Sequence, residues 1–242
     1  MPPSDSRLYP SLGLHGKVAH QIGRRIVTAT IAEGSLLPPE ADLAAEFDVS
    51  RQAVREALKV LAAKGLVVSR RRTGTRVMPR TNWNLLDPDI LAWYPPDKFP
   101  PQLLADLVEV RRLIEPAAAE YAAMRGDKAR VAAIGEAVAE MRRTVADVAA
   151  FRQADAGFHI AIFAASGNDI IERLGDTIGP MLRASFLVQD QARGMQLAAA
   201  VIPAHESIYE AIVAGNGSAA RREMEVLLSR ASREVAAIVA GR

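Results

Sequence analysis

The chain has 242 residues, half of them hydrophobic, and it contains no cysteine and only four histidines. This composition allows one large or two ordinary domains, and it excludes disulfides, thiolate metal sites and a cysteine nucleophile. The start, MPPSDSRLYPS, lacks the apolar region of a signal peptide, and no window approaches 18 uninterrupted apolar residues. We therefore expect a cytoplasmic protein with no transmembrane helix.

The net charge of +2 is unevenly distributed. Residues 1–80 hold 13 Lys and Arg against 7 Asp and Glu, whereas the remaining residues hold 17 against 21. A basic first third attached to a mildly acidic remainder indicates a nucleic-acid-binding module joined to another domain. Uneven surface charge without a function is the alternative interpretation.

Residues 1–14 are expected to form a flexible tail, and residues 15–79 carry the pattern of a small DNA-binding domain. An i, i+4 apolar stripe predicts a first helix from about Lys17 to Ala32, ended by Gly34. A second short helix is expected after Pro38-Pro39, because proline is favoured in the first helical turn.

A third helix and a hairpin complete this first domain. Ser50 is a favourable N-cap for the helix, and Lys64-Gly65 is a typical C-terminal stop. Leu66–Ser69 and Thr75–Met78 are expected to form two strands, joined by a turn in which Gly74 can adopt a positive φ. This order of elements predicts a winged helix-turn-helix.

The third helix begins with side chains suited to reading DNA bases. Arg51 and Arg55 are one turn apart on one face, and arginine can bond the O6 and N7 atoms of guanine. The basic turn of the hairpin would reach phosphates or the minor groove. Two arginines alone are more often solvated, but the full arrangement favours DNA contacts. The candidate DNA-binding residues are Ser50, Arg51, Gln52, Arg55, Arg70, Arg71, Arg72, Thr73 and Gly74.

The rest of the chain is predicted to be helical. Residues 80–102, rich in proline and tryptophan, are expected to form a linker with a short helix near Asp87–Tyr94. From residue 103 onward, periodicity and glycine punctuation predict helices at 103–124, 128–146, 148–166, 168–189, 195–214 and 217–239. The expected fold class is mainly α: an N-terminal winged helix-turn-helix with a small β-hairpin, plus a C-terminal all-α bundle of six to seven helices over 103–242.

Three side chains of the C-terminal half have the spacing of a metal site. Asp155 and His159 are four residues apart and project from one helix face, while His205 comes from another helix. Two nitrogens and a carboxylate suit a divalent metal such as Zn, Ni or Mn. In a second interpretation no metal binds, and the three side chains form hydrogen bonds with an effector. In a third, they are ordinary polar residues, with Asp155 capping its helix or pairing with Arg152.

Longer stretches resemble a known family. The run LLPPEADLAAEFDVSRQAVREALKVLAAKGLVVSRRRTGTRV resembles the N-terminal domain of the GntR family of bacterial transcription regulators. The phrases EVRRLIEPAAAEYAA, FRQADAGFHIAIFAASGN and AHESIYEAIVAGN resemble the all-helical FCD ligand-binding domain of its FadR subgroup. The segment NWNLLDPDILAW is similar to the linker of members of the galactonate type, which respond to sugar acids. One departure is Ala41, where some relatives place an arginine.

The resemblance implies a ligand-responsive regulator that binds a double-stranded, pseudo-palindromic operator as a homodimer. It further implies a repressor released by a small carboxylate effector such as a sugar acid. It places Arg111 in the effector cavity, where a guanidinium can pair with a carboxylate, and gives Arg183 as a second candidate. The effector-binding residues implied are Arg111, Asp155, His159, Arg183 and His205.

The resemblance also places Asp155, His159 and His205 at metal-ligand positions. Members with a full site add a histidine one helix later, where this chain has Leu227. The metal site therefore has at most three protein ligands.

Two other classes of function compete with this interpretation. A metal-responsive regulator is the first alternative. A metal-dependent hydrolase on the helical bundle is more remote, because the segment beginning at His205, HESIY, lacks the second histidine of HExxH. The sequence also holds no G-x-S-x-G, P-loop or dinucleotide fingerprint. We therefore expect no enzymatic activity.

Overall fold

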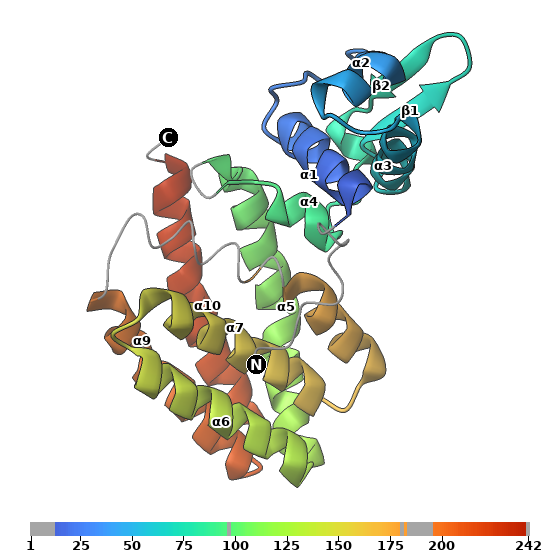
Figure 1. Cartoon of the computed structure of the whole chain (residues 1–242). Coiled ribbons are helices and arrows are strands. Elements are labelled where there is room, and N and C mark those ends of the chain that lie inside the picture. Colours follow the sequence, from blue (N-terminus) through green and yellow to red (C-terminus); the bar gives the residue numbers. More distant parts are fainter. Residues whose placement is uncertain (1–12, 96–97, 180–181, 183–195, 241–242) are drawn as a thin grey trace. The chain divides into compact units, whose positions relative to one another are not determined.

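The computed structural model describes residues 13–95, 98–179, 182 and 196–240, and the chain divides into two compact units, one ending at Lys98 and the next beginning at Phe99 (Figure 1). The first unit is a winged helix and the second a helical bundle, so the expected mainly α fold class is confirmed. None of the described helices is long and apolar enough to span a membrane.

The N-terminal unit contains the three helices and the hairpin in the expected order. Their bounds are α1 Leu14–Val27, α2 Glu40–Glu46, α3 Arg51–Ala63, β1 Val67–Arg70 and β2 Gly74–Val77. The two strands pair antiparallel. Buried apolar side chains from all three helices, among them Ile22, Leu43 and Leu61, form the core of this unit.

The first helix ends earlier than the sequence predicts. It stops at Val27, and Ala29 has a φ of 57° directly after the C-cap residue Thr28. The hydroxyl of Thr28 donates to the carbonyl oxygen of Arg24 at 2.7 Å, in place of a further helical turn. The expected end at Ala32 was therefore wrong, because an alanine rather than a glycine takes the left-handed conformation.

The segment expected to be a linker packs on the winged helix. It forms a 3-10 turn at Arg80–Asn82 and the short helix α4 at Pro88–Ala92. The indole nitrogen of Trp93 donates to Nδ1 of His20 on α1 at 3.0 Å. The Trp93 ring also covers Gly23, where an added Cβ would come within 2.4 Å of it. Glycine at this position thus lets α4 lie close to α1.

A buried ion cluster joins the same segment to the end of α3. Lys64 is the C-cap of α3, and its Nζ lies 2.8 Å from Oδ1 of Asp87 and 2.5 Å from Oδ2 of Asp89. The Asp89 side chain is 1% exposed. Burial alone lowers the pKa of Lys64, but hydrogen bonds to the two carboxylates outweigh burial and raise that pKa.

The C-terminal unit is built from long helices. They are α5 Pro101–Arg125, α6 Lys128–Thr144, α7 Val148–Ala165, a helix over 169–179, α9 Gln196–Val213 and α10 Gly217–Ala240. Helix α5 packs along α10, and α6 packs against α7 (Figure 1). The side chains of Asp127, Asp147 and Asn168 accept backbone hydrogen bonds and so cap three of these helices.

Replacing the cation of the buried cluster is expected to destabilise the N-terminal unit. Lys64→Met would remove the cation that neutralises the half-buried carboxylate of Asp87 and the buried carboxylate of Asp89, at a cost of about 3 kcal/mol. Both tryptophans of the chain, Trp83 and Trp93, lie in this unit. Urea unfolding followed by tryptophan fluorescence therefore measures the stability of this unit alone.

The matched control is Lys59→Met on the same helix. The Lys59 side chain is 73% exposed and pairs with Glu56 at the surface, where ion pairs contribute little. Equal losses for Lys64→Met and Lys59→Met would contradict a structural role for the buried cluster.

Candidate DNA interface and effector site

The N-terminal turn of α3 presents polar side chains to solvent. The hydroxyl of Ser50 accepts from the backbone N–H of Ala53 at 3.2 Å and so caps the helix. Arg51 and Gln52 are exposed, while Val54 on the opposite face is fully buried. The first turn is thus held in place by its cap and its core contact, and its outward side chains are available to DNA.

Arg55 is held by a residue that was not among those expected from the sequence. Its Nε lies 2.7 Å from Oε2 of Glu40, the first residue of α2, and its side chain is 63% exposed. Glu40 thereby restrains the Arg55 side chain. A glutamate in the first turn of a helix is commonly explained by the helix dipole. The residue type of Glu40 therefore did not predict its contact with Arg55.

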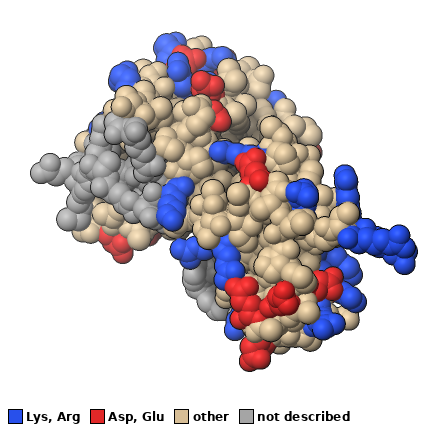
Figure 2. Space-filling view, turned by 90° about the horizontal axis from the view of Figure 1, so that it is seen from above, with Lys and Arg blue, Asp and Glu red and all other residues tan. Residues whose placement is uncertain are grey.

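The wing is a tight basic loop. Arg70 pairs with Gly74 across the ladder, which leaves Arg71, Arg72 and Thr73 as the loop. All five residues are exposed, and Arg72 has a φ of 71°. Figure 2 shows basic side chains gathered and projecting at one edge of the surface. The predicted contacts of recognition helix and wing therefore belong to one unit and are all solvent-facing.

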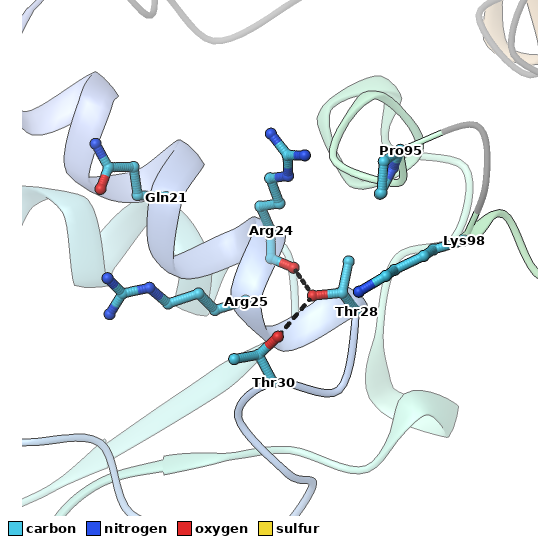
Figure 3. A pocket seen from close by; sticks show the side chains of 7 residues that line it. All are labelled: Gln21, Arg24, Arg25, Thr28, Thr30, Pro95 and Lys98. Atoms are coloured by element: carbon cyan, nitrogen blue, oxygen red, sulfur yellow. Dashed lines mark hydrogen bonds between the residues drawn. The ribbon is translucent and has the colours of Figure 1, made fainter.

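A pocket of about 510 Å³ lies at the C-terminal end of α1 (Figure 3). Its lining residues are Gln21, Arg24, Arg25, Thr28, Thr30, Pro95 and Lys98. Arg25 is engaged by Glu46 at 2.6 Å. The lining holds three basic and no acidic side chains, which favours anions, and it includes none of the residues predicted to bind DNA or effector.

The bundle brings four of the predicted effector residues together. Helix α5 supplies Arg111, α7 supplies Asp155 and His159, and α9 supplies His205, each at most 8% exposed. Arg183 lies outside the described residues. Burying four ionisable side chains in one place is costly unless they pair with one another, so their contacts decide what the site can do.

Asp155 lies between the two histidines. Its Oδ1 is 3.0 Å from Nε2 of His205 and 3.5 Å from Nε2 of His159. Nδ1 of His205 lies 2.8 Å from the carbonyl oxygen of Val201, which can only accept, so Nδ1 carries the proton and Nε2 faces the carboxylate. A carbonyl behind the ring is the usual support of a metal-binding histidine.

The three side chains fit a divalent metal. One ligand atom from each of Asp155, His159 and His205 can be chosen so that all lie within 4.8 Å of one another. Two ligands of a tetrahedral ion, at bond lengths of about 2.0–2.2 Å, lie about 3.3–3.6 Å apart, so the cluster would have to contract to close on such an ion. Leu227, which the family resemblance places at the position of a further ligand, is a buried residue of α10.

Arg111 is held by Glu115, a fully buried carboxylate that was not expected from the sequence. Nε of Arg111 lies 2.6 Å from Oε1 of Glu115, and its Nη2 lies 3.0 Å from Nε2 of His159. Oε2 of Glu115 lies 2.7 Å from Nδ1 of His159. The i, i+4 spacing of Arg111 and Glu115 was the available signal, but such pairs usually lie on solvated helix faces.

The pKa values follow from these contacts. Burial raises the pKa of Glu115, but the charges of Arg111 and His159 outweigh it and lower that pKa to about 2. Burial also opposes ionisation of Asp155, yet hydrogen bonds from His159 and His205 hold its pKa well below the usual range. For His159, burial and the charge of Arg111 lower the pKa, but Glu115 and Asp155 together outweigh them, so the pKa is raised. The carboxylates of Glu115 and Asp155 are therefore ionised within the bundle.

Two family models match the chain: that of the bacterial regulatory proteins of the gntR family over residues 14–77, and that of the FCD domain over residues 106–230. The chain belongs to the GntR family and carries an FCD domain. Among solved structures, its fold is similar to that of Lar, which controls the expression of the Listeria monocytogenes agr system. The TM-score is 0.66 at 18% identity, covering 94% of this chain and 98% of Lar.

Curated relatives extend the similarity along most of the chain. It is 33% identical over 222 residues to the galactonate operon transcriptional repressor of Escherichia coli (strain K12), covering 90% of this chain and 95% of that protein. It is 32% identical over 229 residues to the putative L-lactate dehydrogenase operon regulatory protein of the same organism, covering 89% and 84%. The chain is accordingly a transcription regulator and not an enzyme.

Adding the fourth ligand is expected to strengthen metal binding. Leu227→His would offer a further imidazole to the cluster of Asp155, His159 and His205, and should raise Zn affinity on the order of tenfold or more. Calorimetric titration with Zn, against a competing chelator, measures the change. Val226→His, one residue away and 63% exposed in the parent chain, is the control. Equal Zn affinities for the two variants would contradict the alignment that places the missing ligand at Leu227.

Proposed function

We propose that this regulator is a homodimeric repressor and that a small carboxylate effector releases it from a pseudo-palindromic operator. The observation that carries the proposal is a buried arginine, Arg111, whose Nε is anchored by Glu115. The guanidinium also carries two Nη groups, and this fork matches the geometry of a carboxylate. In the described structure Nη2 lies 3.0 Å from Nε2 of His159, and an incoming carboxylate would replace internal contacts of this kind.

The relatives support a hydroxy acid as effector. One is named for the galactonate operon and another for the L-lactate dehydrogenase operon, and galactonate and lactate are both 2-hydroxycarboxylates. Arg111 would bind the carboxylate, and Asp155, His159 and His205 would bind hydroxyl groups. Sugar acids have the larger number of hydroxyls, which favours them for a cluster of three polar side chains.

A metal ion fits the same cluster. Asp155, His159 and His205 would hold Zn, Ni or Mn, and the bound ion would supply a Lewis acid for the oxygens of the effector. The close approach of the three ligand atoms also favours a second candidate function, in which the ion itself is the signal. Operator binding that follows added Zn and ignores hydroxy acids would support that second function.

DNA recognition is assigned to the start of α3 and to the wing. Arg51, Gln52 and Arg55 would contact base edges in the major groove, and Arg70–Gly74 would contact the backbone or minor groove. Two such heads in a dimer would match two half-sites. The effector must bind one arrangement of the heads better than the other, because equal affinity would shift nothing.

Removing a base contact should weaken operator binding without affecting the effector. Arg51→Ala is expected to reduce affinity for the operator about 5- to 150-fold, since a bidentate arginine–guanine pair contributes about 1–3 kcal/mol. Fluorescence anisotropy with DNA from the region upstream of the protein's own gene measures the affinity. Lys59→Ala, which removes a positive charge farther along α3, is the control. Unchanged affinity for Arg51→Ala would show that this helix does not read the site as proposed.

Changing the cavity arginine should abolish the response and leave DNA binding intact. Arg111→Lys keeps a cation beside Glu115 but loses the fork, and Arg111→Met with Glu115→Gln removes both charges. Both proteins are expected to bind operator within about twofold of the parent. Neither should be released by D-galactonate or L-lactate at concentrations that release the parent.

The ligands are compared in a band-shift assay, with galactitol as the uncharged control. Release of the parent by galactitol as well as galactonate would argue against a carboxylate effector. Release of both Arg111 variants by galactonate would argue against Arg111 as its contact. Circular dichroism checks that the variants are folded.

A further inference from the structure

The pocket at the C-terminal end of α1 holds more positive charge than the helix itself accounts for. Arg24, Arg25 and Lys98 line it, and no acidic side chain does. Basic residues in the last turn of a helix complement its dipole, which accounts for Arg24 and Arg25. Lys98 comes from the segment after α4 and lines the same pocket. Cations that gather in a concave site attract an anion.

The three cations differ in their partners. Arg25 pairs with Glu46 at 2.6 Å, and its guanidinium lies 5.3 Å from the centre of the Phe47 ring. In Figure 3 the Arg25 side chain is directed away from Arg24. Within the described part of the chain, Arg24 and Lys98 form no ion pair, and both are exposed. Two positive charges are therefore available to a ligand.

The negative end of the α1 dipole is covered by the chain itself. The carbonyl oxygen of Arg24 accepts from the backbone N–H of Thr28 at 3.1 Å and from its hydroxyl at 2.7 Å. The carbonyl oxygen of Arg25 accepts from the backbone N–H of Ile31 at 3.0 Å. The exposed hydroxyl of Thr30 lies 3.1 Å from that of Thr28 and can turn to a ligand instead. An anion would therefore meet cations and a hydroxyl here, and not bare carbonyl oxygens.

We propose that this pocket binds a sugar phosphate, with the phosphate group between Arg24 and Lys98. A phosphate monoester carries a charge of about −1.5 to −2 at neutral pH, which two cations balance. A single carboxylate would leave one of the two cations uncompensated. The charge of the site therefore selects a phosphate over the carboxylate that Arg111 would bind in the bundle.

The size and lining of the pocket indicate the rest of the ligand. Its volume of about 510 Å³ is more than a phosphate group alone fills, and it lies within the range of about 300–1,000 Å³ that small-molecule sites occupy. The amide of Gln21 and the hydroxyl of Thr30 also line the pocket, and both can donate and accept hydrogen bonds. A remainder that carries several hydroxyl groups, such as a sugar, fits this lining.

The site is separate from the carboxylate site of the bundle. All its lining residues belong to the N-terminal unit, which also contains the recognition helix. Lys98 is the last residue of that unit, so a ligand held between α1 and Lys98 would fix the end of the DNA-binding unit. The regulator would thus have a second small-molecule input, independent of the effector.

Calorimetric titration of the full-length protein with glucose 6-phosphate, at constant ionic strength, tests the site. Arg24→Gln combined with Lys98→Gln is expected to weaken binding tenfold or more, since a hydrogen bond to a charged group contributes about 1.5–3 kcal/mol. Lys17→Gln combined with Lys59→Gln is the matched control, because it removes the same charge from exposed positions of α1 and α3. This control should bind glucose 6-phosphate within about twofold of the parent.

Two further probes and one further variant separate this site from the bundle. Glucuronate, which has a carboxylate in place of the phosphate, should bind the pocket at least tenfold more weakly, and glucose should not bind. Arg111→Lys should leave the affinity for glucose 6-phosphate unchanged. Loss of that affinity in Arg111→Lys, with none in the variant of Arg24 and Lys98, would place the ligand in the bundle and overturn the proposal.

Other outcomes would overturn it in different ways. Equal losses in the two double variants would show unspecific attraction between exposed charges, which salt screens. Equal affinities for glucuronate and glucose 6-phosphate would refute the phosphate assignment. A parent protein that does not bind glucose 6-phosphate would refute the site. If its operator affinity then fell on changing Arg24 and Lys98 but not in the control, the pocket would be a contact for the DNA backbone.

Discussion

The C-terminal unit depends on the requirement that buried charges be paired. Arg111, Glu115, Asp155, His159 and His205 come from three helices, and each is at most 8% exposed. None of these groups could remain ionised alone in a helical interior, so each fixes the position of its neighbours. The network thereby sets how α5, α7 and α9 lie against one another. A ligand that binds among these side chains would replace one of their charged contacts. Its binding would therefore depend on how the three helices are arranged.

The N-terminal unit also contains a buried charge that is paired. Lys64 ends the recognition helix and is held between Asp87 and Asp89. The segment between winged helix and bundle is consequently part of the DNA-binding unit as far as Lys98. Any conformational change transmitted from the bundle would therefore act on the recognition helix and the attached segment as one unit, rather than through a flexible linker.

Within the described residues, local patterns were sufficient for the order and approximate bounds of the helices, since caps such as Ser50 and apolar periodicity are properties of neighbouring residues. They failed at α1, where Ala29 adopts a conformation that its residue type disfavours. They also missed the packing of Trp93 on Gly23, which joins positions 70 residues apart. At the candidate site, the structure brings together Arg111, Asp155, His159 and His205, which the family resemblance had selected. Glu115 was overlooked, because a glutamate within a helix is usually solvated.

Helix α5 connects two surfaces that differ in kind. Arg111 and Leu113 are two residues apart, about 200° around the helix axis, so one is buried within the bundle and the other is exposed. A rotation or shift of α5 on effector binding would move both side chains at once. A contact made with Arg111 inside the bundle would therefore also change the outer surface of α5.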